Sequence, residues 1–305
     1  MLYLPAPSAE ADSPAPPLFN GPGASTPRPA TRGKSTRPMD PLSDLESKSI
    51  YIIREARHRF RRLALLWSMG KDSTALLWMC RKAFLGRVPF PVVHIDTGHK
   101  FPEMYHFRDR YVREWNLALI VGSNRAARDA GVGPGKGSKF DCCTALKTEA
   151  LRQVIREHGF EAVLVGIRRD EHGIRAKERY FSPRNESFQW DYRNQPPELW
   201  DHYKSLSDDG QHIRVHPLLH MTELDVWRYI QRESLPMVEL YFARNGQRFR
   251  SIGCAPCCTP MESEASDVGE IIAELATTSI SERAGRAQDK ERAGTMQQLR
   301  ALGYM

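Results

Sequence analysis

The stretch LALLWSMGKDST at residues 63–74 decides the fold of this chain. An apolar run at 63–67 predicts a buried strand, and a helical pattern resumes at Thr74. The short polar loop between them places unpaired backbone N–H groups at the start of a helix, which is a site for anions. Gly70 lets the backbone approach a ligand closely, and Lys71 adds a positive charge. We expect the following residues to bind a nucleotide: Ser68, Gly70, Lys71, Asp72, Ser73 and Thr74.

The loop is not a Walker A motif, because the pattern G-x-x-x-x-G-K-[ST] is absent from it. Its form S-x-G-K-D-S at 68–73 resembles the PP-loop of the ATP pyrophosphatase superfamily, whose members cleave ATP between the α and β phosphates. The alternative is an ordinary connection between a strand and a helix. A six-residue form placed directly after a strand favours the nucleotide site over that alternative.

Composition and charge narrow the class of ligand. The chain has 305 residues, a net charge of +7 and 41% hydrophobic residues, enough for one large domain or two small ones. The positive charge suits a polyanionic ligand, and no basic run is interleaved with aromatic residues, so we expect a small anion rather than nucleic acid. No apolar stretch approaches the ~18 residues of a membrane span, and no signal peptide is apparent. We therefore predict a cytoplasmic protein that does not cross a membrane.

Three segments differ in composition. Residues 1–41 are rich in Pro, Ala and Ser and are predicted to be a disordered extension, with Met39 as an alternative start. Residues 42–235 are predicted to form an α/β nucleotide-binding domain. Residues 236–305 form a C-terminal segment with a Cys-x-x-Cys motif and a helical tail.

The middle segment alternates between helical and strand patterns. Asp141 and Thr222 are predicted to begin helices, and Gly159 to end one. The predicted helices are 45–60, 74–84, 101–115, 142–158 and 223–233, and the predicted strands are 63–67, 90–95, 117–121, 162–166 and 213–218. Short apolar strands that alternate with helices predict a doubly wound, mostly parallel sheet with helices on both faces. Ligands bind such sheets at the carboxyl ends of the strands.

Polar residues gather at those predicted strand ends. Asp96 could bind a ribose hydroxyl or a magnesium–phosphate group, and His94 is either a buried core histidine or a site residue. The segment GIRRDEHGIRAKERYFS at 166–182 is rich in arginine, whose paired donors suit tetrahedral oxyanions. Its alternative is a solvated charged loop. Gly166 and Asp170 complete the predicted nucleotide site, and the predicted oxyanion ligands are Arg168, Arg169, Arg175 and Arg179.

Several motifs occur in an order that resembles a known family. They are SMGKDST, PFPVVHIDTGHKFPEMYHFRD, GIRRDE…RAKER, WDYRNQPPELW, IRVHPLLHMTELDVWRYI and the tail TTSISERAGRAQDKERAGTMQQLRALGYM. Over residues 39–305 the chain resembles the small catalytic subunits of the two-subunit sulfate adenylyltransferases. The resemblance implies an adenine nucleotide alpha hydrolase-like fold and a reaction in which ATP and sulfate give adenosine 5′-phosphosulfate and pyrophosphate. It also implies a larger GTP-hydrolysing partner subunit.

The resemblance also implies roles for individual residues. Lys71, with Mg²⁺, would hold the leaving pyrophosphate of ATP. Arg168 and Arg169, with Arg175 or Arg179, would hold sulfate or the α-phosphate. Sulfate is already ionised, so no general base is needed and catalysis would rest on positioning and charge stabilisation.

The cysteines depart from this family. Of the six, Cys80 lies in an apolar helical pattern and is expected in the core. A tandem pair is followed about 110 residues later by a Cys-x-x-Cys motif, and this order resembles the 4Fe–4S ligands of assimilatory adenylylsulfate reductases. The predicted ligands are Cys142, Cys143, Cys254 and Cys257, with Cys258 spare. Zinc binding and free thiols stay open as alternatives.

Two other enzyme functions compete with the transferase. The cysteine set favours an adenylylsulfate reductase, but such reductases need a nucleophilic cysteine near the C-terminus, and no cysteine follows Cys258. A tRNA-thiolating enzyme with the same loop would need a tRNA-binding region, which the sequence does not indicate. The transferase is therefore the predicted function.

Overall fold

The computed structural model describes residues 40–193, 195, 197–198, 212–286, 298–299 and 301–303. Of the extension predicted at 1–41, residues 1–39 lie outside these ranges, whereas Pro41 already begins the first helix. Much of the predicted helical tail also lies outside them. The boundary predicted at residue 235 stays a prediction.

The described part of the chain alternates between helices and strands. The helices are α1 (Pro41–Arg59), α2 (Lys71–Ala83), α3 (Pro102–Glu114), α4 (Arg125–Asp129), α5 (Lys139–Cys143), α6 (Ala150–His158), α7 (Glu223–Glu233) and α8 (Val268–Thr277). The strands are β1 (Leu63–Leu66), β2 (Val92–Ile95), β3 (Leu119–Gly122), β4 (Ala162–Leu164), β5 (Phe181–Arg184), β6 (His212–Val215), β7 (Gln247–Arg248) and β8 (Met261–Glu262). A π-helical turn, η1 (Thr144–Glu149), joins α5 to α6, and 3₁₀ turns are η2 (Arg175–Lys177), η3 (Glu239–Tyr241) and η4 (Ala255–Cys257).

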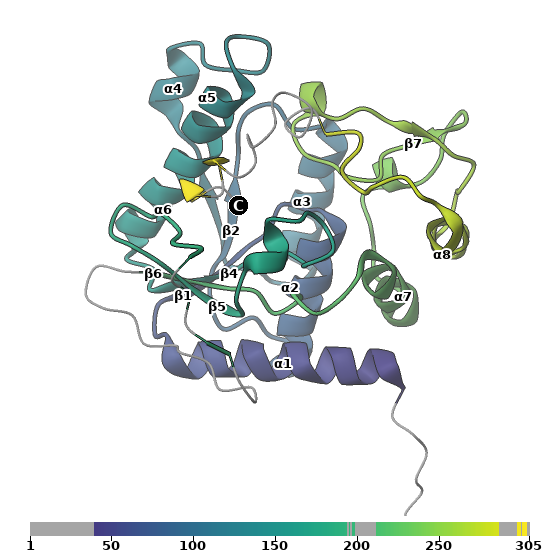
Figure 1. Ribbon diagram of the computed structural model, residues 1–305, viewed down its shortest axis with the longest axis horizontal. Coiled ribbons are helices and arrows are strands. Elements are labelled where there is room, and N and C mark those ends of the chain that lie inside the picture. The colour runs from purple at the N-terminus through teal and green to yellow at the C-terminus, as the bar shows by residue number, and fades with distance from the viewer. Residues whose placement is uncertain are drawn as a thin grey trace, which may run out of the picture. The chain divides into compact units, whose positions relative to one another are not determined.

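The main sheet has six strands in the order β3-β2-β1-β4-β6-β5. All neighbouring strands are parallel except β5, which pairs antiparallel with β6. The chain moves from β1 outward to β2 and β3, and then crosses back to β4 on the other side of β1 (Figure 1). The strand order therefore reverses at β1 and β4, which is where such sheets bind ligands. The predicted doubly wound, mostly parallel sheet is confirmed.

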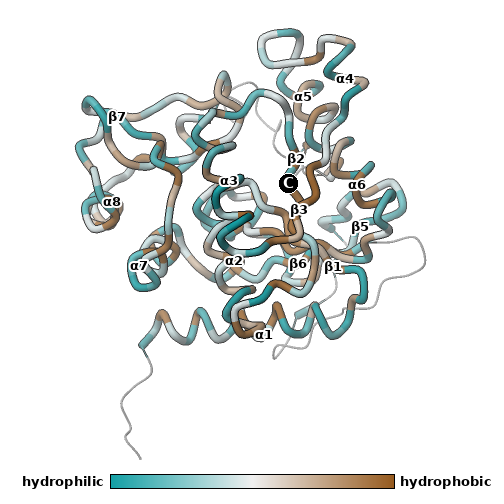
Figure 2. The backbone as a smooth tube through the Cα atoms, turned by 180° about the vertical axis from the view of Figure 1, so that it is seen from behind, coloured by the Kyte–Doolittle hydropathy of each residue, from teal (hydrophilic) through white to brown (hydrophobic). Residues whose placement is uncertain are grey.

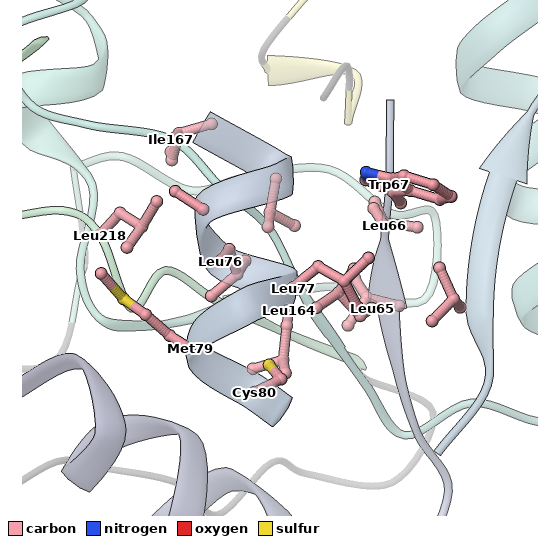
Figure 3. Close-up of a cluster of buried hydrophobic side chains, with 14 of the residues drawn as sticks. Leu65, Leu66, Trp67, Leu76, Leu77, Met79, Cys80, Leu164, Ile167 and Leu218 are labelled. Carbon is pink, nitrogen blue, oxygen red and sulfur yellow. The ribbon is translucent and has the colours of Figure 1, made fainter. Parts of the chain in front are cut away.

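Helices and strands share one hydrophobic core. β1, β2 and β4 are buried along their whole length, because helices cover both faces of a parallel sheet. Side chains of α2 lie against β1 and β4, as the close-up of Leu76, Leu77 and Leu65 shows (Figure 3). Cys80 is fully buried in this core, as predicted. Along α1, hydrophobic and hydrophilic segments alternate in the hydropathy view, which fits its buried face (Figure 2).

Helix boundaries agree with the predictions at some points and differ at others. Thr222 begins α7 with a capping box, and Gly159 ends α6 in the left-handed conformation, so both predictions are confirmed. The prediction that Asp141 begins a helix was wrong. Ser138 begins α5 and accepts a hydrogen bond from the backbone N–H of Asp141 at 3.1 Å. The predicted helix 142–158 is divided into three consecutive elements, the end of α5, then η1 and α6. The division arises because the backbone of η1 forms i→i+5 hydrogen bonds, the π-helical pattern, in place of α-helical ones.

Two further differences concern the site. Helix α2 begins at Lys71, three residues before the predicted start, so Lys71, Asp72 and Ser73 lie in its first turn. The antiparallel edge strand β5 was not predicted, since FSPR carries no alternating pattern. None of the described helices is both long enough and apolar enough to cross a membrane.

Candidate active site

A cavity of about 150 Å³ opens at the carboxyl ends of the central strands. It is lined by the loop 67–73 after β1, by the ends of β2 and β4, and by two segments from the last quarter of the chain, 251–253 and 282–286. The topology brings these segments together because the carboxyl ends of parallel strands meet at one edge of a sheet. The cavity therefore lies where the sequence predicts the ligand site.

The loop after β1 holds its shape through its own polar groups. The Ser73 hydroxyl accepts a hydrogen bond from Ser68 N–H at 3.2 Å and donates one to the Gly70 carbonyl at 3.1 Å. The backbone N–H of Lys71 donates to the Tyr241 hydroxyl at 2.9 Å. Gly70 lies close to these groups, since a Cβ there would meet the Ser68 hydroxyl at 3.3 Å. The loop presents backbone N–H groups and hydroxyls at the start of α2, an arrangement suited to phosphate.

Lys71 is buried among carboxylates. Its ammonium pairs with Asp72 at 3.1 Å and with Glu282, and Glu223 lies 3.9 Å away. Burial lowers the pKa of Lys71, but these carboxylates outweigh burial and raise the pKa above its ordinary value. Lys71 is therefore a permanent positive charge at the cavity wall.

Arg168 does not line the cavity, and it is fully buried behind the loop. It donates to Asp170 at 2.9 Å and also pairs with Asp72 and Glu282. These three carboxylates come from α2, the loop after β4 and the C-terminal segment. Arg168 therefore ties the loop to its surroundings, a different place from the oxyanion contact that the sequence predicts.

The other predicted residues divide between the cavity and its surroundings. Ser68, Gly70, Asp72, Ser73, His94, Gly166 and Arg175 line the cavity along with Lys71. Thr74 lies outside it, where its hydroxyl accepts a hydrogen bond from the Trp67 indole at 3.1 Å. Arg169 lies over the Tyr180 ring, and Asp170 accepts from the backbone N–H of Glu223 at 2.7 Å. The lining also excludes Asp96 and Arg179.

Asp96 and His94 differ in their surroundings. Asp96 accepts hydrogen bonds from the Gly98 N–H at 2.8 Å and from the Tyr105 hydroxyl at 2.7 Å. His94 is fully buried, and burial lowers its pKa to about 3, so its ring is neutral. Its Nδ1 lies 3.2 Å from the Trp67 carbonyl, while Nε2 has no hydrogen-bond partner in the part of the chain that the structure describes. A neutral ring nitrogen at the cavity wall is suited to a polar edge of a bound nucleotide.

Apolar side chains line the part of the cavity nearest the strands. They are Leu66, Val93, Ile95, Val165, Ile167 and Ile252. Together with the polar loop they give the cavity two regions, one apolar and one that binds anions. This division matches a nucleotide, which has a flat base at one end and phosphates at the other.

The cysteines of the two predicted ligand motifs gather at one side of the site. The thiols of Cys143, Cys254 and Cys257 all act electrostatically on Cys142, whose pKa burial raises to about 11. Cys254 Sγ lies 3.3 Å from the Thr97 hydroxyl. Within the described ranges, no group of three or more Cys, His, Asp or Glu side chains stands at the spacing of metal ligands. The four thiols therefore lie close together but not in a closed ligand shell.

Several cavity residues were not predicted as site residues. The charged and aromatic-hydroxyl ones that matter most here include Lys100, Lys147, Tyr241, Glu282, Arg283 and Arg286. The last three belong to the stretch SERAGR at 281–286, in which cations alternate with small residues. This pattern is the signal in the sequence that could have indicated these residues. Tyr241 gave no signal, because a tyrosine in a short turn is most often a core residue.

Comparisons with known proteins agree with this geometry. The model of the phosphoadenosine phosphosulfate reductase domain matches residues 62–260. "Sulfate adenylyltransferase subunit 2" of Saccharophagus degradans is 43% identical over 293 residues, covering 86% of this chain and 97% of that protein. The protein of the same name from Rhodospirillum rubrum is 43% identical over 297 residues, covering 87% and 100% of the two chains.

Solved structures share the fold at lower identity. Phosphoadenylyl-sulfate reductase from Candida auris is 19% identical with a TM-score of 0.50, covering 70% of this chain and 94% of that one. FMN adenylyltransferase from Candida glabrata is 16% identical with a TM-score of 0.51, covering 87% and 84%. On the evidence of the long, closely matched relatives, this chain belongs to the sulfate adenylyltransferase subunit 2 family and carries the phosphoadenosine phosphosulfate reductase domain.

Proposed function

We propose that this chain is the catalytic small subunit of a sulfate adenylyltransferase, which transfers AMP from ATP to sulfate and releases pyrophosphate. The observation that carries this proposal is the loop 68–73 at the start of α2, with Lys71 at the wall of a cavity in a chain of this family. The apolar region beside β2 and β4 accommodates the adenine, and the loop accommodates the β- and γ-phosphates.

The reaction then needs no proton transfer. A sulfate oxygen attacks the α-phosphorus, the bond from that phosphorus to the bridging oxygen breaks, and pyrophosphate leaves with the bonding electrons. Lys71 and the N–H groups at the start of α2 stabilise the charge on the leaving pyrophosphate. Mg²⁺ bound to the phosphates would neutralise further charge, and the Asp72 and Glu282 carboxylates at the cavity wall are oxygen ligands of the kind it prefers.

The test is pyrophosphate release that depends on sulfate, measured with the larger subunit and GTP present. Lys71→Ala is expected to abolish release, while Lys136→Ala, which removes an exposed lysine outside the cavity, leaves it unchanged. Circular dichroism checks that both variants are folded. Normal release by folded Lys71→Ala would reject the role of the loop.

We propose a larger GTP-hydrolysing subunit as partner and the cytoplasm as location. The name shared by the relatives, subunit 2, supports a partner, and the resemblance supports its GTPase class. Co-expression of the two chains followed by affinity purification and size exclusion tests this partnership. Elution of this chain alone, with full sulfate-dependent release, would contradict it.

We also propose that the gathered thiols hold a 4Fe–4S cluster. All four thiols are buried, and three of them lie close enough to Cys142 to raise its pKa. Cationic side chains lie near Cys142 and Cys254. The number and chemistry of these thiols fit an anionic cluster. When bound, such a group supplies negative charge beside the cavity and need not exchange electrons. The chain's own contribution is the set Cys142, Cys143, Cys254 and Cys257.

The cluster is tested by anaerobic purification with iron and acid-labile sulfide analysis. Cys254→Ser is expected to lose the iron, whereas Cys80→Ser, a core cysteine away from the set, keeps it. Equal iron in the two variants would reject the ligand assignment, and zinc in place of iron would identify the other metal.

The same thiols favour one competing function, an adenylylsulfate reductase. Sulfite production from adenosine 5′-phosphosulfate with a thiol reductant would support it. Residues 259–305 contain no cysteine that could supply the attacking thiol, which argues against it. We expect no sulfite above the level of a heat-inactivated control.

A further inference from the structure

The charged residues around the cavity fall into two sets with different surroundings. Near the loop after β1, each cation has a carboxylate beside it. Lys71 pairs with Asp72, and Arg283 pairs with Glu171 at 2.9 Å. Lys100 and Arg286 line the same cavity, and among the described residues neither forms an ion pair with a carboxylate. This second set carries positive charge that no acidic side chain within the described ranges neutralises by an ion pair.

The Arg286 side chain is held by a hydrogen bond, but one of its donors lacks an acceptor among the described residues. It is 5% exposed, and its Nη1 donates to Cys258 Sγ at 3.0 Å. Its Nε is buried and has no hydrogen-bond partner among the described residues. The guanidinium lies against Gly253, where a Cβ would come within 2.4 Å of Nη2 and would displace it from this position. A buried arginine donor without a partner at a cavity wall is costly until an acceptor arrives.

Lys100, which follows β2 in the chain, also lines the cavity among cations and thiols. Its backbone forms a bridge with Cys254, which brings the residue next to the segment 251–253. The charged groups that act on it are the cations Lys147 and Arg286 and the thiols Cys254 and Cys258, and no carboxylate is among the main ones. Burial and the neighbouring cations lower its pKa to about 8. Such a group of cations is stabilised by a bound anion.

We propose that Lys100, whose backbone bridges Cys254, and Arg286, which lies against Gly253, form the subsite for the tetrahedral oxyanion acceptor, sulfate, in the reaction proposed above. This assignment rests on that proposed function. It replaces Arg168 and Arg179, neither of which lines the cavity. The loop for pyrophosphate and the cations for sulfate line one cavity, so both groups can bind on either side of the α-phosphate, as an in-line displacement requires. Lys147 lines the same cavity and adds charge near Lys100.

The subsite also has a chemical preference. It offers an ammonium and a guanidinium and, among the residues that define it, no carboxylate. Dianions of tetrahedral shape therefore suit it, and selenate and molybdate are expected to compete with sulfate. Neutral or singly charged acceptors would leave one cation without a partner.

The experiment compares steady-state constants for the two substrates in the assembled enzyme. Lys100→Met and Arg286→Gln are expected to raise the KM for sulfate about tenfold or more, the loss typical of one charge-assisted hydrogen bond, with the KM for ATP changed less than about twofold. Lys100→Arg keeps the charge and is expected to retain most of the sulfate affinity. Lys136→Met and Arg110→Gln remove exposed cations of the same types and serve as matched controls.

Sulfate binding measured directly by calorimetry, in the presence of a non-hydrolysable ATP analogue, gives a second readout. Iron content is measured in each variant, because both residues lie beside cysteines. Weakened sulfate binding with unchanged iron supports the subsite. Unchanged sulfate KM and binding in both variants overturns it. If the wild-type enzyme binds sulfate but releases no pyrophosphate, the proposed reaction is wrong. The subsite is then tested by whether the two variants weaken sulfate binding in calorimetry.

Discussion

The carboxylate of Glu282 accepts a hydrogen bond from the ammonium of Lys71, 211 positions earlier in the chain. Its second oxygen pairs with Arg168. One acidic side chain from the C-terminal segment thus holds both the cation of the nucleotide loop and the arginine behind it. Burial raises the pKa of Glu282, but these two cations outweigh burial and hold the pKa below its ordinary value.

Glu282→Gln should destabilise the nucleotide-free protein. Removing one partner of a buried ion pair leaves uncompensated charge and costs about 3–5 kcal/mol of unfolding free energy. Phosphates of ATP supply negative charge to the released cations, so ATP should stabilise this variant more than the wild type. Denaturant unfolding with and without ATP measures both effects. Glu264→Gln, an exposed residue, is the control. Equal unfolding free energies for wild type and Glu282→Gln would contradict the prediction.

Gly166→Ala should weaken ATP binding. A Cβ at this position would lie 3.0 Å from the backbone nitrogen of Ser73 and 3.1 Å from the carbonyl oxygen of Asp72, so the nucleotide loop would have to move. Overpacking against backbone costs about 1–3 kcal/mol, and the KM for ATP should rise about tenfold. Gly173→Ala, in the same segment with no atom within 4 Å of its Cβ, should behave as wild type. Similar KM values for the two variants would show that the loop tolerates the contact.

Thr222→Ala should lower stability by about 1 kcal/mol. The Thr222 hydroxyl accepts a hydrogen bond from Asp225 N–H at 3.2 Å, and the Asp225 carboxylate accepts one from Thr222 N–H at 2.9 Å. Thr222→Ser keeps the first bond and should lose little. Urea unfolding of the three proteins measures the difference. Matching midpoints for the alanine and serine variants would show that the hydroxyl does not contribute.

His212→Phe should make stability less dependent on pH. Burial, and then Arg214 and Arg184, hold the pKa of His212 well below its ordinary value of 6.5, so the folded protein keeps this ring neutral. As pH falls below 6.5 the unfolded chain binds a proton that the folded chain does not, so the wild type loses about 1.4 kcal/mol per pH unit from this residue. Phenylalanine fits beside Phe188, whose ring centroid is 4.7 Å away. Unfolding free energies at pH 7 and pH 5 test this, and an equal fall in both proteins would refute it.

The sequence predicts the central strands and the place of the site, because both rest on local patterns. The apolar run before Ser68, the polar loop and the helical pattern after it are visible in twelve consecutive residues. Their meeting with Gly166 follows from the rule for parallel strand ends. The early start of α2 at Lys71 was missed, because Asp72 and Ser73 are favoured both in loops and in the first turn of a helix.

Long-range pairing explains the remaining differences. The five cations of 166–182 look alike in the sequence, and only the fold shows that Arg168 meets three carboxylates while Arg175 reaches the cavity. Glu282 and Arg286 lie more than 100 positions from the loop and the strands that they complete. No local pattern reports such a contact. The π-helical turn after Cys143 could not be predicted either, since its sequence, TALKTE, is that of an ordinary α-helix.

The position of Glu282 and Arg286 near the end of the chain has a consequence for synthesis. The ribosome makes the nucleotide loop at residues 68–73 early, and adds the Glu282 carboxylate that contacts Lys71 more than 200 positions later. A nascent chain released before residue 281 would keep Asp72 and Glu223 beside Lys71 but would lack Glu282, the residue that ties Lys71 to Arg168. Such a chain would also lack the cavity lining from 282–286, so the site is completed only when this segment has been made.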